Sequence, residues 1–161
     1  AEISVNFSVT TVDAALARRL EPRAPRPDLR FEAMAALGRA GVTTRLFLMP
    51  IVPRLTDGEA HLAALLCAGR AAGAAGAVSG VLFLRPGTRE VFFDFLAVEF
   101  PALVPEYARL YAGSAYARAD YVAEVDALVR RLAEAVGFPV RRREDRREAP
   151  RAAARQLALV W

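Results

Sequence analysis

Three stretches decide the fold: EISVNFSVT at residues 2–10, TTRLFLMPIV at residues 43–52 and AVSGVLFL at residues 77–84. Each is a short run rich in β-branched, aromatic or leucine side chains, which is typical of a strand. Two stretches that we interpret as helices, residues 27–40 and 58–72, lie between them. Strands that alternate with helices predict an α/β fold, in which a parallel sheet is covered by helices.

The number of units limits what these strands can form. Three parallel strands cannot close a barrel, and they leave two open edges. The chain also enters its first strand directly from Ala1, without a targeting segment. We therefore expect these residues to be the second half of a larger α/β structure.

The amino-acid sequences of several segments resemble those of a known family. The chain is similar, in order from Ala1 to Val140, to radical SAM proteins of the spore-photoproduct-lyase-like branch. The resemblance rests on AEISVNFSV at residues 1–9, PRAPRPDLRFEAMAALGRAGV at 22–42, LMPIVPRLTDGE at 48–59 and GVLFLRPGTREVFFDFL at 80–96. By resemblance, the three strands would be the fourth to sixth strands of a partial (β/α)6 barrel.

The same resemblance implies a cofactor chemistry. In that family a four-iron four-sulfur cluster cleaves S-adenosylmethionine to a 5′-deoxyadenosyl radical, which abstracts hydrogen from the substrate. The branch suggests a nucleic-acid lesion as that substrate. The cluster motif CxxxCxxC is absent here, and the only cysteine is Cys67. The resemblance thus implies a half-barrel whose partner, the N-terminal half, holds the cluster.

The first strand carries the main candidate site. Ile3, Val5, Phe7 and Val9 alternate with a polar row, and successive strand residues point to opposite faces. The polar row consists of Ser4, Asn6 and Ser8. If helices cover the apolar face, this row would line a barrel interior, where by resemblance it would contact S-adenosylmethionine. The alternative is an edge strand with one face in water.

Two further candidates lie at strand ends. Pro50 lacks an N–H group, so the sheet ladder should fail near it. By resemblance this backbone lies beside the adenine, where Pro50, Ile51 and Val52 would pack. Arg85 ends the third strand and could bind the methionyl carboxylate with two hydrogen bonds, or pair with a nearby acid instead.

The composition bears on where the protein is located and on whether it contacts a membrane or a metal. Although 55% of residues are hydrophobic, no uninterrupted apolar run approaches the length of about 20 residues that a membrane span needs. A single cysteine suits a reducing cytosol, so we expect a cytoplasmic protein without membrane contact. His61 has no HxxxH partner, which argues against a metal site. Cys67 lies in the apolar run AALLCA and is predicted to be buried.

The rest of the chain is predicted to be helical and then tail-like. We expect a helix at residues 89–100 with Thr88 as its cap, a short helix in PALVPEYARLYAG at residues 101–113, and a longer one at about residues 118–136 that stops at Gly137. This gives residues 1–100 as the half-barrel and 101–140 as a helical extension, which we expect to pack under or beside the barrel.

The basic charge lies in one segment. The Arg-rich linker at residues 141–155 holds seven arginines against three acids, and this excess accounts for the net charge of +4. It suits a solvated tail, or a phosphate-binding segment that contacts nucleic acid. The peptide QLALVW at Gln156–Trp161 resembles peptides that bind the bacterial sliding clamp, or else it packs back on the body.

The sequence therefore predicts a C-terminal fragment of a radical SAM enzyme. Two rival hypotheses remain. The chain could be a non-catalytic module recruited to DNA through its basic tail and the QLALVW peptide. It could also be half of a different (β/α) barrel or open-sheet enzyme. A CxxxCxxC motif encoded upstream of Ala1 would discriminate among them.

Overall fold

The computed structural model describes residues 3–138. Within them lies a three-stranded, fully parallel sheet of strands β1 (Ser4–Ser8), β2 (Thr43–Ile51) and β3 (Ala77–Val81), in the order β1-β2-β3. The mixed α/β class and all three predicted strands are confirmed. The Arg-rich linker and the QLALVW peptide lie outside the described residues.

Six α-helices accompany the sheet in the described part of the chain. They are α1 (Ala14–Leu20), α2 (Pro27–Arg39), α3 (Glu59–Ala71), α4 (Thr88–Glu99), α5 (Val104–Leu110) and α6 (Ala119–Ala135), with a 3-10 turn at Pro101–Leu103. Five of these elements follow the sequence prediction closely.

The helix α1 was not predicted. It is short, and its start is set by one residue. The Asp13 carboxylate accepts hydrogen bonds from the backbone N–H groups of Ala15 at 2.8 Å and Leu16 at 3.1 Å, which satisfies donors left free by the first turn. The signal in the sequence was Asp13 itself, followed by a run of good helix formers.

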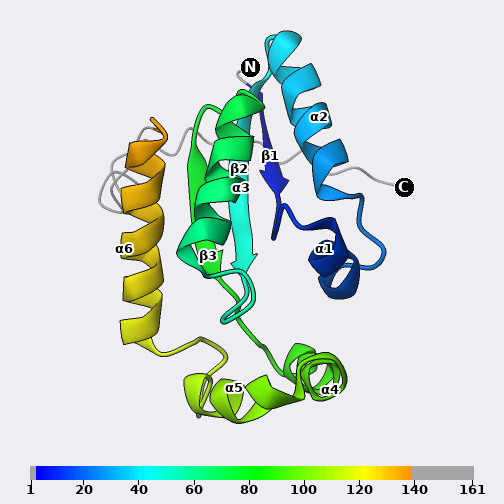
Figure 1. The fold of residues 1–161 in the computed structure, drawn as a ribbon, viewed down its shortest axis with the longest axis vertical. Coiled ribbons are helices and arrows are strands. Elements are labelled where there is room, and N and C mark those ends of the chain that lie inside the picture. The colour runs from blue at the N-terminus through cyan, green and yellow to red at the C-terminus, as the bar shows by residue number, and fades with distance from the viewer. Residues whose placement is uncertain (1–2, 139–161) are drawn as a thin grey trace, which may run out of the picture.

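Three helices cover one face of the sheet. Figure 1 shows α3 running along the strands in front of β2, with α2 and α6 on either side of it. Their contact with the strands forms the first core. It includes Val9, Leu46, Leu48, Ile51, Met34, Leu62, Leu65, Leu66, Val125 and Val129, all of which are buried. Because side chains alternate along each strand, the strand residues of this core point toward the helices, and their neighbours along the strand point to the opposite face.

The third βα unit differs from the prediction. The helix at residues 89–100 was expected to follow β3 as its covering helix. Instead α4 and α5 lie beyond the carboxyl ends of the strands, and α6 returns along the sheet to pack on α3 and β3 (Figure 1). Ser79 of β3 donates a 3.4 Å hydrogen bond to Asp126 of α6. The helical extension therefore does not simply sit beside the sheet, because its last helix completes the covering layer.

The helices α4 and α5 enclose a second core at this end of the sheet. Its buried members are Val52, Leu84, Leu96, Tyr107, Tyr111 and Ala117, and Phe92, Phe95 and Phe100 pack against them. On α4, Phe92, Phe95 and Leu96 pack toward this core, whereas the Val91 side chain is 70% exposed.

Several local predictions are corrected by the structure. Cys67 was expected to be buried, but it lies on the exposed side of α3. The capping residue of α4 is Gly87 rather than Thr88, and that of α3 is Gly58. The stop after α6 is confirmed, since Gly137 has a φ of 78° and its N–H binds the Glu134 carbonyl at 3.0 Å.

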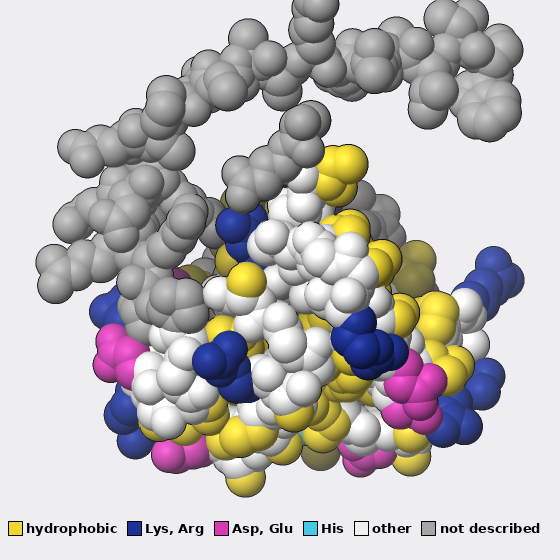
Figure 2. Space-filling model, turned by 90° about the horizontal axis from the view of Figure 1, so that it is seen from above, with side chains coloured by type: hydrophobic (Ala, Val, Ile, Leu, Met, Phe, Trp, Pro, Cys, Tyr) yellow, Lys and Arg dark blue, Asp and Glu magenta, His cyan; other side chains and the backbone are white. Residues whose placement is uncertain are grey.

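The surface of the body carries dispersed charge. Figure 2 views the end of the molecule where the strands begin, and there basic and acidic side chains are interspersed with hydrophobic and uncharged groups. This agrees with a body whose arginines and acids balance. Within residues 3–138, none of the helices combines the length and the hydropathy needed to cross a bilayer.

The close approach of α3 to β2 gives a test of the fold. A Cβ atom at Gly69 would lie 2.5 Å from Leu46 Cδ2, and Leu46 is fully buried. Gly69→Ala should therefore lower the free energy of unfolding by about 1–3 kcal/mol through overpacking. Urea unfolding measures this change.

Gly38 of α2 supplies the matched control, because a Cβ atom there would meet nothing within 4 Å. Gly38→Ala should be neutral or stabilise by up to about 1 kcal/mol, as expected for alanine in a helix. Equal effects of the two substitutions would show that α3 does not pack this closely on β2.

Candidate functional site

The face of the sheet opposite α2, α3 and α6 carries the predicted polar row. Ser4, Asn6 and Ser8 are all exposed there, whereas Val5 and Phe7 between them are half-buried. The structure thus brings the three residues together on one face, in the order along β1 that the alternation predicted. Ser8 is nearest the carboxyl end of the strand, where ligands of parallel α/β sheets bind.

The neighbouring strand widens this face. Asn6 lies opposite Arg45 and Ser8 opposite Phe47 in the parallel register, and both partners are half-buried. On the third strand, Gly80 shares the face, because a Cβ atom built there would meet the Met49 side chain at 3.3 Å. The face therefore offers a hydroxyl and carboxamide row at one edge, and aromatic and thioether surface beside it.

The backbone below Ser8 is held from the covered side. Arg30 of α2 donates from Nη1 to the Ser8 carbonyl oxygen at 2.6 Å and from Nη2 to Glu21 at 3.1 Å. The Val9 N–H donates to the Phe47 carbonyl at 2.9 Å. The backbone at the end of β1 is thereby anchored, so its polar side chain is presented from a rigid strand.

Pro50 lies where it was predicted, at the end of β2. The pairing of β2 with β3 is irregular between Leu48 and Ile51, as expected when a residue without an N–H interrupts the ladder. Pro50 is half-buried, but Ile51 and Val52 are each 2% exposed and belong to the two cores. Of this predicted trio, only Pro50 keeps surface for a ligand.

Arg85 is exposed and stands apart from the polar row. It follows β3, and β2 separates β3 from β1, so two strand spacings of about 5 Å each lie between them. Its guanidinium carbon lies 5.4 Å from the centre of the Phe83 ring. The structure thus places Arg85 at the same end of the sheet as Ser8, but not in contact with it.

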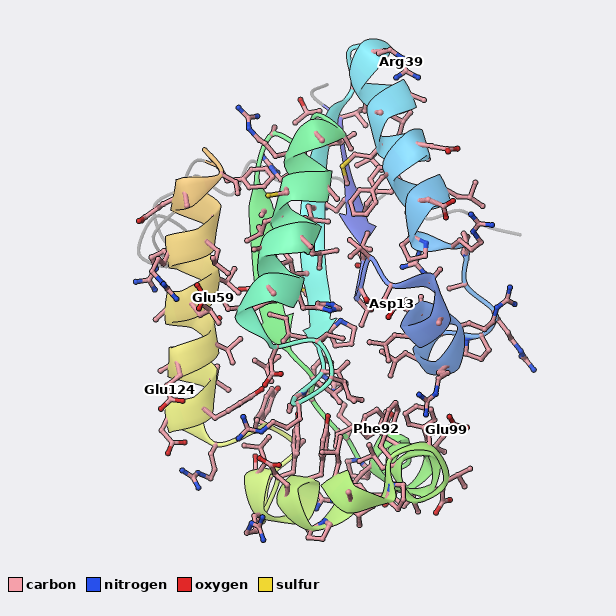
Figure 3. All side chains as sticks on the ribbon, viewed as in Figure 1. Asp13, Arg39, Glu59, Phe92, Glu99 and Glu124 are labelled. Atoms are coloured by element: carbon pink, nitrogen blue, oxygen red, sulfur yellow. The ribbon has the colours of Figure 1, made fainter. Side chains whose placement is uncertain are left out.

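Three tyrosines fix the loops at this end of the sheet. Tyr107 of α5 and Tyr111, which directly follows this helix, donate from their hydroxyls to the carbonyl oxygens of Pro53, at 2.6 Å, and Leu82, at 2.7 Å. Tyr121 of α6 donates to Asp57 at 2.6 Å. In Figure 3, Phe92 points from α4 toward the other side chains that fill this region. The exits of β2 and β3 are therefore tied to α5 and α6.

The environment of these tyrosines shifts their ionisation. Burial, which penalises the phenolate, raises the pKa of Tyr107 and Tyr111 well above the usual value near 10. Burial and the hydrogen bond to the Asp57 carboxylate also raise the pKa of Tyr121. The three hydroxyls therefore stay protonated and donate hydrogen bonds at physiological pH.

The loop after β2 contains one unusual conformation. Arg54 has a φ of 62°, a region that residues other than glycine rarely adopt. Its Nε atom donates to Glu106 of α5 at 2.6 Å, and this hydrogen bond raises the pKa of the Arg54 guanidinium. The Thr56 hydroxyl oxygen accepts from the Val52 N–H at 2.7 Å. These contacts define the loop beside the end of the sheet.

Metal-ligating chemistry is not assembled in the described part. No group of three His, Cys, Asp or Glu side chains with ligand geometry occurs among residues 3–138. The polar row on β1 instead presents neutral groups that both donate and accept hydrogen bonds, which suits hydroxylated ligands such as ribose.

Sequence reasoning missed one exposed feature near Arg85. The rings of Phe83 and Tyr116 stack on each other with centroids 6.0 Å apart, and both are largely exposed. They lie 33 positions apart, in a strand exit and in a loop between helices. Periodicity gave no signal for their contact, because neither belongs to a helix or strand.

Comparison with known proteins gives relatives without a described function. The chain is 36% identical over 119 residues to an uncharacterized protein of Mycobacterium bovis, and equally to uncharacterized proteins from two strains of Mycobacterium tuberculosis. The match covers 74% of this chain and 35% of each relative, so the chain spans about a third of their length. No family model matches the chain, and no solved structure matches it.

The tyrosine pKa values predict how stability depends on pH. Tyrosines of the unfolded chain release their protons near pH 10, whereas Tyr107 and Tyr111 in the folded chain retain theirs. The folded state then binds more protons, so the free energy of unfolding should be fully present below about pH 10 and fall above it. The chain contains no lysine, which keeps this window free of ammonium titration.

The double variant Tyr107→Phe, Tyr111→Phe tests the origin of this slope. Near neutral pH its free energy of unfolding should be lower than that of the parent by about 1–3 kcal/mol per hydroxyl removed, since each change leaves a carbonyl oxygen unpaired. Above about pH 10 its free energy of unfolding should also fall less steeply with pH than that of the parent. Urea unfolding from about pH 8 to about pH 11 measures both effects. Tyr116→Phe, at a site 63% exposed, serves as control. Identical slopes in the parent and the double variant would contradict the prediction.

Proposed function

We propose that this chain is the C-terminal half of the partial (β/α)6 barrel of a radical SAM enzyme, and that it binds S-adenosylmethionine on the open face of its sheet. One observation carries the proposal. An exposed row of Ser4, Asn6 and Ser8 lies on a parallel sheet whose covering helices α2, α3 and α6 are all on the opposite face.

This one-sided arrangement is the one a barrel requires. In a (β/α) barrel the helices form an outer ring, and the side chains of the opposite face point into the interior. Parallel sheets in proteins normally have both faces covered, so an open polar face calls for a further layer or a closed lumen. The matched relatives continue well beyond the matched segment, which leaves length for the remaining strands.

In this proposal, different residues of this end of the sheet bind different parts of S-adenosylmethionine. The Asn6 carboxamide and the Ser8 hydroxyl bind ribose hydroxyls, since each both donates and accepts hydrogen bonds. Ser4 lies deeper, near the start of β1, and supports the same row. Pro50 packs beside the adenine, and Arg85 reaches the methionyl carboxylate from the end of β3.

The cluster does not belong to this chain. A four-iron four-sulfur cluster of this family is held by three cysteines, whereas Cys67 is the only cysteine here and lies on the exposed side of α3. The sheet itself lies between α3 and the open face. The cysteine ligands must therefore come from the N-terminal half of the barrel, and no reaction step is assigned to residues of this chain.

The gene provides the first test. The codons upstream of Ala1 should encode further βα units with a CxxxCxxC motif after the first strand. An upstream region without that motif would remove the radical SAM assignment and favour half of another (β/α) barrel.

Binding measurements provide the second test. In the protein that carries both barrel halves, Asn6→Ala and Ser8→Ala should each weaken S-adenosylmethionine binding by about five- to a hundredfold, because each deletes a hydrogen bond in an enclosed site. Calorimetric titration measures the affinity. Glu32→Gln on α2 is the control, since Glu32 is exposed on the helix layer. Unchanged affinity in both variants would exclude the polar row from the site.

A further inference from the structure

An exposed pair of aromatic rings is built into the end of the sheet. The side chains of Phe83 and Tyr116 are 48% and 63% exposed, and their rings stack with centroids 6.0 Å apart and planes inclined by 30°. Large aromatic side chains normally bury most of their surface, so a paired exposure calls for an explanation.

The pair is held by the backbone rather than by chance contact. Residues 83 and 116 form an antiparallel bridge, and the Leu84 N–H donates to the Ala115 carbonyl at 2.7 Å. Leu84 is 1% exposed in the second core. The chain on one side of the pair is therefore anchored, which presents the two rings from a fixed position.

Two arginines lie at this end of the sheet, Arg85 beside the Phe83 ring and Arg89 against the loop that leads to Tyr116. The Arg85 guanidinium lies 5.4 Å from the centre of the Phe83 ring, and that of Arg89 lies 5.0 Å from the Phe93 ring. Arg89 donates to the carbonyl oxygens of Tyr111 and Ser114, at 3.0 Å and 3.4 Å. Neither arginine takes part in an ion pair with an acid of the described residues.

We propose that Phe83 and Tyr116, with Arg85 beside Phe83 and Arg89 bound to the loop before Tyr116, form a stacking platform for the bases of single-stranded nucleic acid. Aromatic faces attract bases of any kind, and guanidinium groups next to them attract the phosphates of the same strand. The combination of planar apolar surface and unpaired positive charge on one exposed patch matches both parts of a nucleotide.

The open shape of the platform favours a strand over a free nucleotide. Both rings lie at the surface, and stacking on such a face strengthens binding by roughly five- to a hundredfold per base. One base therefore gives little affinity by itself. A strand adds contacts between successive phosphates and the surrounding arginines, and that addition brings binding into a useful range.

This inference goes beyond the proposed cofactor function and does not depend on it. The platform rests on residues of β3's exit and the loop before α6, whereas S-adenosylmethionine was assigned to the row on β1. Arg85 takes part in both proposals, so the test leaves Arg85 unchanged and alters only the two rings. Its measurement needs neither an iron-sulfur cluster nor S-adenosylmethionine.

The test compares two strands that have the same phosphates. Fluorescence anisotropy measures binding of the full chain to labelled oligo(dT) of about 12 nucleotides and to an abasic strand of equal length. The basic linker at residues 141–155 contributes equally to both, so the ratio of affinities isolates the bases. We expect oligo(dT) to bind about five- to a hundredfold more tightly, with an affinity that falls as salt rises.

Ring substitutions then locate the preference. Phe83→Leu and Tyr116→Leu keep apolar bulk but remove the aromatic face, and each should reduce the ratio toward one. Tyr116→Phe should preserve it, and Val98→Ala, at a site 79% exposed on α4, should leave it unchanged. Circular dichroism verifies that each variant is folded. Equal affinity for the two strands, or a base preference that survives both leucine variants, would overturn the proposal.

Discussion

The close contact between α3 and the central strand organises this molecule. Gly69 lies so near Leu46 that a single added carbon would overlap it, which sets how closely the helix layer lies against the sheet. The helices α2 and α6 lie on either side of α3, on the same face of the sheet, so the first core forms on that face alone. The other face of the sheet then keeps Ser4, Asn6 and Ser8 at its surface. The open polar face is thus a direct consequence of a one-sided helix layer.

A second constraint acts at the carboxyl ends of the strands. Tyr107, Tyr111 and Tyr121 each send a hydroxyl to a strand exit or its loop, and burial keeps these hydroxyls protonated. The two hydrogen bonds to main-chain carbonyls satisfy backbone groups that the sheet no longer pairs. The loops that border the open face are therefore held by α5 and α6. Both the proposed cofactor face and the aromatic platform depend on this anchoring, because each uses residues at or next to a strand end.

The two proposed surfaces have different physical characters, which keeps their tests separate. The row on β1 offers neutral hydroxyl and carboxamide groups that suit a hydroxylated ligand. The platform of Phe83 and Tyr116 offers π-faces and adjacent guanidinium charge on an open surface. A ligand of the first kind is recognised by hydrogen bonds, whereas a ligand of the second kind is recognised by stacking and by phosphate charge, and only the second responds strongly to salt.

The sequence by itself determined the local elements and their faces. Strand periodicity placed Ser4, Asn6 and Ser8 on one side of β1, and helical spacing identified the buried side of α6, because both signals depend only on neighbours along the chain. Tertiary structure decided which helix covers β3: α6 takes that place instead of α4, since the aromatic residues of α4 pack with α5 beyond the strand ends. It also left Cys67 exposed and brought Phe83 to Tyr116. Such contacts join residues distant in the chain, so no local pattern could specify them.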